Sequence, residues 1–173
     1  MLFVCGEIDC REGLVQAVLK GKHATLDDAV RETVDVLVQA LSRCSAERES
    51  MRFLVLPVPP PVDAAQRSRA VCVSLFNEEL RCRMADEAVG RFAAFVDYES
   101  DLGVAYKPQN GDEKLSAELT QCLSAKKRRS ASLAKAPSLR PELNADGIHM
   151  NANFLPLLER ELKGVSRNAS QRK

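Results

Sequence analysis

One short segment near the carboxyl terminus pairs a carboxylate with an imidazole. Residues 146–151 read Asp-Gly-Ile-His-Met-Asn, which places Asp146 three positions before His149, one of two histidines in the chain. A carboxylate at this spacing can bind one ring nitrogen and leave the other free to accept a proton, as in the base and orienter of a nucleophilic relay. The segment predicts Asp146 and His149 as catalytic residues. The alternative is an Asp-Gly turn before a histidine that has no catalytic role.

The nucleophile of such a relay cannot be identified in the sequence. No serine lies in a Gly-Asp-Ser-like or a Gly-x-Ser-x-Gly turn. The thiols of Cys5 and Cys10 are candidate replacements, but buried cysteine is usually an inert small apolar residue. The six cysteines show neither a Cys-x-x-Cys pair nor the spacing of a zinc knuckle. We therefore expect reduced thiols, no metal and no cofactor, and the nucleophile stays unassigned.

Length and composition favour a single cytoplasmic domain. The 173 residues are 45% hydrophobic, which is enough for one core, and the net charge of +1 gives no field that would attract nucleic acid or an anionic membrane. The apolar start of the chain meets Gly6 and Glu7 too early for a signal peptide. No apolar run approaches the roughly 20 residues that span a bilayer.

The elements that would position this chemistry alternate between strand and helix. A polar loop is expected after Gly6, and helical periodicity begins at Thr25, which can cap the helix. We predict strands at 2–5, 51–56 and 92–97, and helices at about 25–44 and after Asp63. This order is typical of a parallel α/β sheet covered by helices, whose functional groups gather beyond the carboxyl ends of the strands. The stiff loop of Pro57 and 59–61, and Asp97, would lie there.

The second half of the chain is less regular. Residues of about 100–145 are predicted to form a flexible insertion, with a basic run at 126–129. That run could be a nuclear localisation signal or a phosphate-binding patch, but a solvated loop is the usual outcome, and nucleic-acid binding is not expected because no aromatic residues interleave it. A last helix is predicted from Asn153, followed by a disordered tail at 164–173.

Two short motifs resemble a known family of hydrolases. Gly6-Glu7-Ile8-Asp9-Cys10-Arg11 follows a hydrophobic strand, and the segment of Asp146 and His149 precedes a helix, as the third and fifth sequence blocks of the SGNH hydrolase superfamily do. The order of strands and helices is also similar to the second half of that flavodoxin-like fold. The resemblance implies that residues 1–163 form a partial SGNH-hydrolase-like domain, with about three parallel strands and flanking helices.

The resemblance implies the chemistry of a serine esterase, lipase or carbohydrate acyl-esterase. In that family His149 matches the base and Asp146 the orienter, while Gly6 and Asp9 match residues of the third block, so that Gly6, Asp9 and Arg11 would line the oxyanion site or pocket. An ion pair between Asp9 and Arg11 at a strand end is the alternative. Ile8 stands where the family has an oxyanion-binding Asn, and loss of one such donor costs about a hundredfold to a thousandfold in rate.

The family's block with the nucleophilic serine has no counterpart in this sequence. The chain is thus expected to be inactive by itself; it is a truncated product, or another chain completes it, or the fold serves a non-catalytic purpose. In the last case we expect an interaction or scaffold domain that pairs with itself or with a partner through an exposed sheet edge. Substrate specificity depends on loop shape and does not follow from the sequence.

Overall fold

A parallel sheet of three strands organises the fold. The computed structural model describes residues 1–3, 5–48, 51–61, 66–97, 99–104, 117–124, 137–143 and 152–171. The strands β1 (Leu2–Phe3), β2 (Phe53–Val55) and β3 (Ala93–Phe95) pair in that order, and all are parallel. Each strand ends at a polar or proline-bearing segment, as the sequence indicates. The predicted α/β class, with about three parallel strands and flanking helices, is confirmed.

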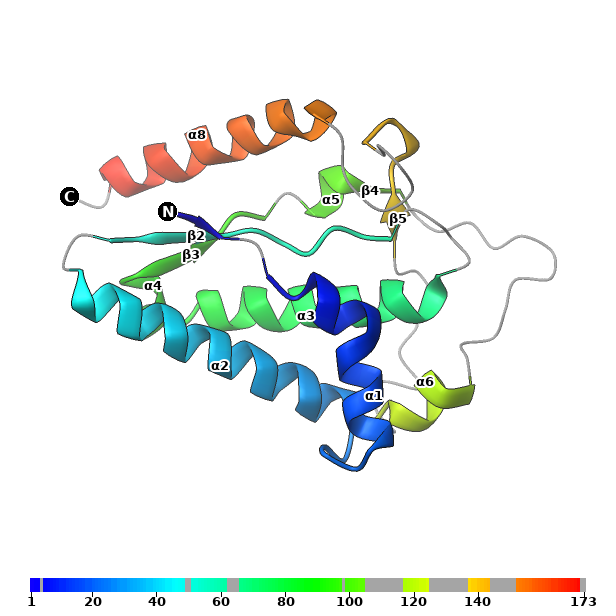
Figure 1. The fold of residues 1–173 in the computed structure, drawn as a ribbon. Helices are drawn as coiled ribbons and strands as arrows, with labels where there is room; N and C mark the ends of the chain where they lie inside the picture. The colour runs from blue at the N-terminus through cyan, green and yellow to red at the C-terminus, as the bar shows by residue number, and fades with distance from the viewer. Residues whose placement is uncertain are drawn as a thin grey trace.

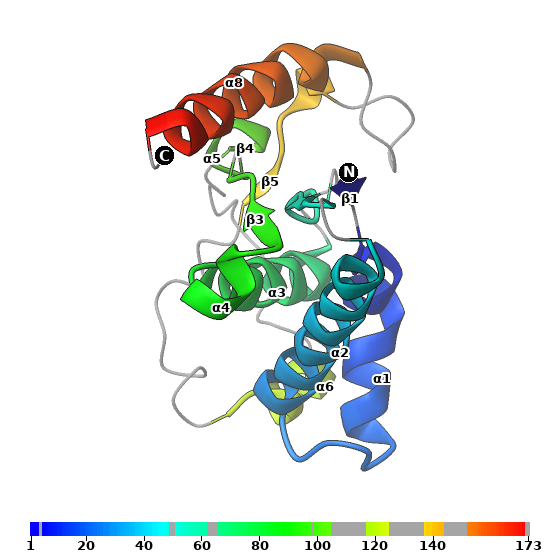
Figure 2. The ribbon, with the colours of Figure 1, turned by 90° about the vertical axis from the view of Figure 1, so that its left-hand side faces the viewer.

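The alternation of side chains along β2 explains the layers on its two faces. Phe53 and Val55 belong to the core that includes α2 (Leu26–Glu47) and α3 (Arg67–Met84). Leu54 and Leu56 instead belong to the core that includes the last helix, α8 (Leu155–Gln171). Successive side chains of a strand point to opposite faces, so this division places helices on both sides of the sheet. Figures 1 and 2 show α8 on one side and α2 with α3 on the other.

Helix α2 forms where the sequence predicts it. Thr25 has extended backbone angles and its hydroxyl accepts a hydrogen bond from the amide of Asp28 at 3.2 Å, so it caps the helix. Val30, Val34 and Leu41 are buried along one face. Propensity, capping and an apolar stripe thus agree, which is why this helix could be predicted.

The polar loop predicted after Gly6 is wrong, because the chain is helical there. A π-helical turn, η1 (Asp9–Gly13), leads directly into α1 (Leu14–Leu19). Cys10 and Leu14 are 2% and 3% exposed and pack in the same core as α2 and α3. Their spacing is that of one helix face, but the charged residues between them hide it in the sequence.

Short elements occupy the described parts of the predicted insertion. They are α5 (Glu99–Leu102), β4 (Gly103–Val104), α6 (Ala117–Cys122), β5 (Ser138–Leu139) and η3 (Pro141–Leu143). A further short helix, α4 (Glu87–Gly90), lies between α3 and β3. Strands β4 and β5 pair antiparallel, and the Cys122 thiol of α6 lies 3.9 Å from the Val15 carbonyl oxygen of α1. These parts therefore have regular structure. The basic run 126–129 lies outside the described residues.

The last helix is longer than the sequence indicates. It follows a 3₁₀ turn, η4 (Ala152–Phe154), and continues past Gly164 to Gln171, where the sequence indicated a tail without regular structure. A glycine inside a helix costs about 1 kcal/mol relative to alanine, which neighbouring helical residues can offset. Leu158 is buried against the sheet, and Arg160 pairs with Asp101 of α5. Packing against the sheet therefore positions this helix.

Candidate functional site

Gly6 lies at the carboxyl end of β1, where its backbone is constrained. Its φ angle is +93°, a conformation that favours glycine, and its carbonyl oxygen accepts a hydrogen bond from the Cys10 amide at 2.9 Å. A Cβ atom at this position would lie 2.5 Å from Cε1 of Phe76, a fully buried residue of α3. The sharp turn and the close approach of the ring both require glycine. The structure thus places Gly6 at the carboxyl edge of the sheet.

An ion pair joins the start of the first helix to the start of α3. Nη2 of Arg69 lies 2.8 Å from Oε1 of Glu7, and its side chain is only 10% exposed. Nη1 of Arg69 also donates to the side chain of Gln66 at 3.2 Å. The Nε atom of Arg69 is buried and has no hydrogen-bond partner among the described residues. The ion pair therefore holds the segment that follows Gly6. Glu7 and Arg69 are 62 positions apart in the sequence, so their pairing could not be predicted from it.

Asp9 and Arg11 do not form the ion pair considered from the sequence. Nε of Arg11 lies 3.6 Å from Oε1 of Glu12, and both Asp9 and Arg11 are exposed on η1. Oδ1 of Asp9 lies beside Gly13, one turn further along, at 3.4 Å from the position that a Cβ of that glycine would occupy. Both residues thus follow Gly6 on the same turn of helix, with their side chains in water.

Asn77 of α3 contacts the backbone at the carboxyl edge of the sheet, a role that was not predicted from the sequence. Asn77 is a polar residue of α3, but it is 0% exposed. Its Oδ1 accepts a hydrogen bond from the Val58 amide at 2.8 Å, and its Nδ2 donates to the Val58 carbonyl at 2.9 Å. The side-chain amide thereby holds the segment that follows β2, whose backbone has no strand partner at this point. The feature of the sequence that could have indicated this burial is an Asn beside Phe76 in an otherwise apolar stripe.

The acidic end of β3 is also engaged by α3. Arg81 binds Asp97 through two contacts, Nε to Oδ2 at 2.7 Å and Nη2 to Oδ1 at 3.2 Å. The same guanidinium lies 5.5 Å from the ring centre of Phe95. Three residues of α3 therefore brace the three strand ends: Phe76 contacts Gly6, Asn77 holds Val58, and Arg81 binds Asp97.

Only one of the two histidines, His23, lies within the described residues. Asp146 and His149, the predicted orienter and base, lie outside the described residues. His23 is partly buried, and its Nδ1 lies 3.3 Å from Oε2 of Glu32. Glu32 belongs to α2, so the contact ties the loop before that helix to the helix itself.

The thiols near Gly6 are not activated. Desolvation raises the pKa of Cys5 to about 11 and that of Cys72 to about 12, from 9.0. Burial also raises the pKa of the Cys10 thiol. A nucleophilic thiol needs the opposite shift, because the thiolate is the reactive form. Cys5 and Cys10 therefore do not have the properties of a replacement for the missing serine.

We expect alkylation to separate the buried from the exposed thiols. Treatment of the folded protein with iodoacetamide at pH 8 should modify Cys44 and Cys82, which are exposed. Cys10 and Cys72 should stay protected, because they are buried and their thiols remain protonated at this pH. Peptide mass spectrometry measures the modified fraction of each. Rapid modification of Cys72 in the native protein, at a rate close to that in urea, would contradict this packing.

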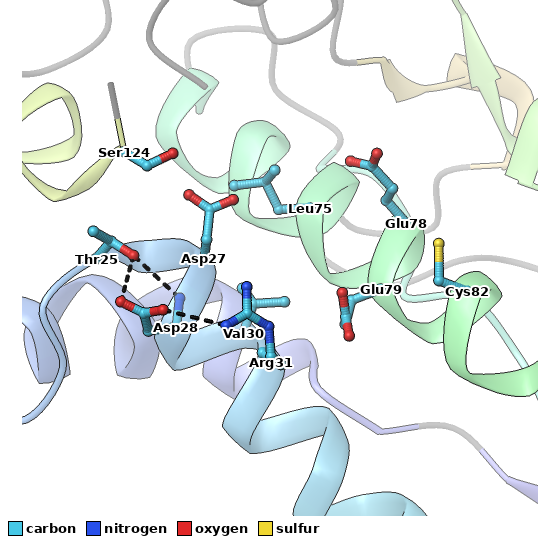
Figure 3. A pocket seen from close by; sticks show the side chains of 10 residues that line it. All are labelled: Thr25, Asp27, Asp28, Val30, Arg31, Leu75, Glu78, Glu79, Cys82 and Ser124. Atoms are coloured by element: carbon cyan, nitrogen blue, oxygen red, sulfur yellow. Dashed lines mark hydrogen bonds and ion pairs between the residues drawn. The ribbon is translucent and has the colours of Figure 1, made fainter. Parts of the chain in front are cut away.

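A shallow groove lies in the helical layer, away from Gly6. It has a volume of about 460 Å³ and runs between α2, α3 and the end of α6. The lining residues are Thr25, Asp27, Asp28, Val30, Arg31, Leu75, Glu78, Glu79, Cys82 and Ser124. Figure 3 shows the carboxylates arranged along the two helices, with Asp28 bound to both Thr25 and Arg31. Of the predicted site residues within the described ranges, Gly6, Asp9 and Arg11 do not line this groove.

Comparisons with known proteins leave the family open. No protein-family model, curated protein or solved structure gives a significant match to this chain. Within the described ranges, no three His, Cys, Asp or Glu residues are grouped so that they could hold a metal ion. The described helices include none whose length and apolar character would let it cross a bilayer.

Proposed function

We propose that this chain forms the carboxyl-terminal part of an SGNH-hydrolase-like site for a carboxylic ester. The observation that carries the proposal is Gly6, which follows the parallel strand β1 and is in close contact with Phe76. Groups that act on ligands gather at this edge of parallel sheets. His149 is the base, Asp146 orients it, and the Gly6 amide is a donor to the oxyanion. A cytosolic location belongs to this proposal and rests on the free cysteines.

The proposed reaction is acyl transfer in two steps. A serine hydroxyl attacks the acyl carbon while His149 takes its proton, and the alcohol leaves with that proton as the acyl-serine forms. Water then attacks the acyl-serine, and the carboxylic acid and free serine are released. This chain offers the base and the oxyanion donor but no identified serine. We therefore propose that the chain by itself does not complete the cycle.

We expect the Gly6 amide to report the protonation of His149. In a His23→Gln background only one histidine titrates, and an unperturbed histidine does so near pH 6.5. The ¹H–¹⁵N shift of Gly6 should follow that titration between about pH 5 and pH 8, because the proposal requires the ring of His149 and the Gly6 amide to lie in one pocket. NMR spectra recorded across this range measure the effect, with the Gly21 amide, in a loop remote from β1, as the reference.

A His149→Gln substitution is the control for this titration, and it should abolish the response of Gly6. An Asp146→Asn variant should keep the response but change its midpoint. The proposal fails if Gly6 does not respond in the His23→Gln protein. Hydrolysis of a short-chain aryl ester, measured in parallel, should be no faster with this protein than with the His149→Gln variant.

A second candidate function is a non-catalytic interaction domain that pairs through the edge of β1. The described sheet ends at this strand, and Leu2 is 46% exposed. The carbonyl groups of Met1 and Phe3 accept hydrogen bonds from the amides of Leu54 and Leu56 at 2.8 and 2.9 Å, so the backbone groups of Leu2 face away from the sheet. This strand also lacks the charges and prolines that usually protect an edge.

A Leu2→Lys substitution should weaken this pairing. If the edge joins two copies, we expect the wild-type protein to sediment as a dimer at tens of micromolar and the variant as a monomer, because a buried ammonium opposes strand addition. Light scattering after size-exclusion chromatography measures the mass. Val36→Lys on α2 is the matched control, since Val36 is 61% exposed but lies away from β1. A monomeric wild-type protein at all concentrations would exclude self-pairing.

A further inference from the structure

We draw no further inference here: the strongest candidate, the acidic groove between α2, α3 and the end of α6, carries nothing because no second observation among the described residues points to a ligand for its cluster of carboxylates.

Discussion

A Gly6→Ala substitution should destabilise the protein by about 2–5 kcal/mol. Two costs add at this position. The φ angle of +93° is unfavourable for a residue with a side chain, by about 1–2 kcal/mol. The new methyl group would also lie 2.5 Å from the Phe76 ring, and overpacking of a core costs about 1–3 kcal/mol. Urea unfolding followed by circular dichroism measures the change in the free energy of unfolding.

Gly21 provides a matched control for the backbone part of this effect. Its φ angle is +71°, but no atom lies within 4 Å of the position that a Cβ would occupy. A Gly21→Ala variant should therefore lose only the conformational part, about 1–2 kcal/mol. The excess loss at Gly6 measures the collision with Phe76. Equal losses at the two glycines would show that the ring does not press on the strand end.

A double-mutant cycle tests the same contact from the other side. Phe76→Leu shortens the side chain beneath Gly6, so part of the steric cost should disappear when the two substitutions are combined. We expect a coupling of about 1–2 kcal/mol, because residues in contact depart from additivity by that order. If the losses simply add, the strain at Gly6 comes from its backbone alone.

The parts of the fold that could be predicted from the sequence have local causes. Helix α2 has a capping threonine and an apolar stripe, and β2 is an apolar run that ends in prolines. The turn at Gly6 has a local cause as well, because a glycine that follows an apolar run of residues indicates a change of chain direction. The strand before it is less buried than the apolar run suggests, since Leu2 is 46% exposed. These features need only neighbours in the chain.

The features that could not be predicted depend on distant partners. The helix after Gly6 is stabilised by burial of Cys10 and Leu14 against α2 and α3, not by a capping signal. The Glu7 and Arg69 pair joins residues 62 positions apart. The sequence alone indicates an ordinary polar helix residue at Asn77, because its partner Val58 is distant in the chain. The sequence thus predicts the three segments that contain the strands, although the strands are shorter than predicted, but not which side chain of α3 contacts the segment after each strand.

Asn77→Ala should cost about 2–5 kcal/mol of unfolding free energy, a large part of the roughly 5–15 kcal/mol of a typical domain. The substitution leaves the amide and the carbonyl of Val58 unpaired, and Val58 is fully buried. Each buried polar group without a partner costs about 1–3 kcal/mol. Urea unfolding measures the loss. Hydrogen exchange should also show faster exchange at the Val58 amide than in the native protein.

Asn153 is the matched control for this substitution. Its Nδ2 also donates to a backbone carbonyl, that of Glu142 at 2.8 Å, but the residue is exposed. Water can replace the lost donor there, so Asn153→Ala should change the unfolding free energy by about 0.5 kcal/mol or less. Similar losses of unfolding free energy in the two variants would show that burial does not determine the cost of Asn77→Ala.

Asn77→Asp should make the stability of the protein depend on pH at this one position. Burial disfavours the charged carboxylate, so the pKa of the new Asp should be raised above its unfolded value of about 3.9. The folded variant then binds a proton more tightly than the unfolded chain, and its stability is greatest at low pH and falls as the pH rises through the folded pKa. The protonated carboxyl group can donate to the Val58 carbonyl and accept from the Val58 amide, as Asn77 does. The difference in unfolding free energy from the wild-type protein should therefore be small near pH 4 and large at pH 8; a difference that is constant over this range would place the side chain in water.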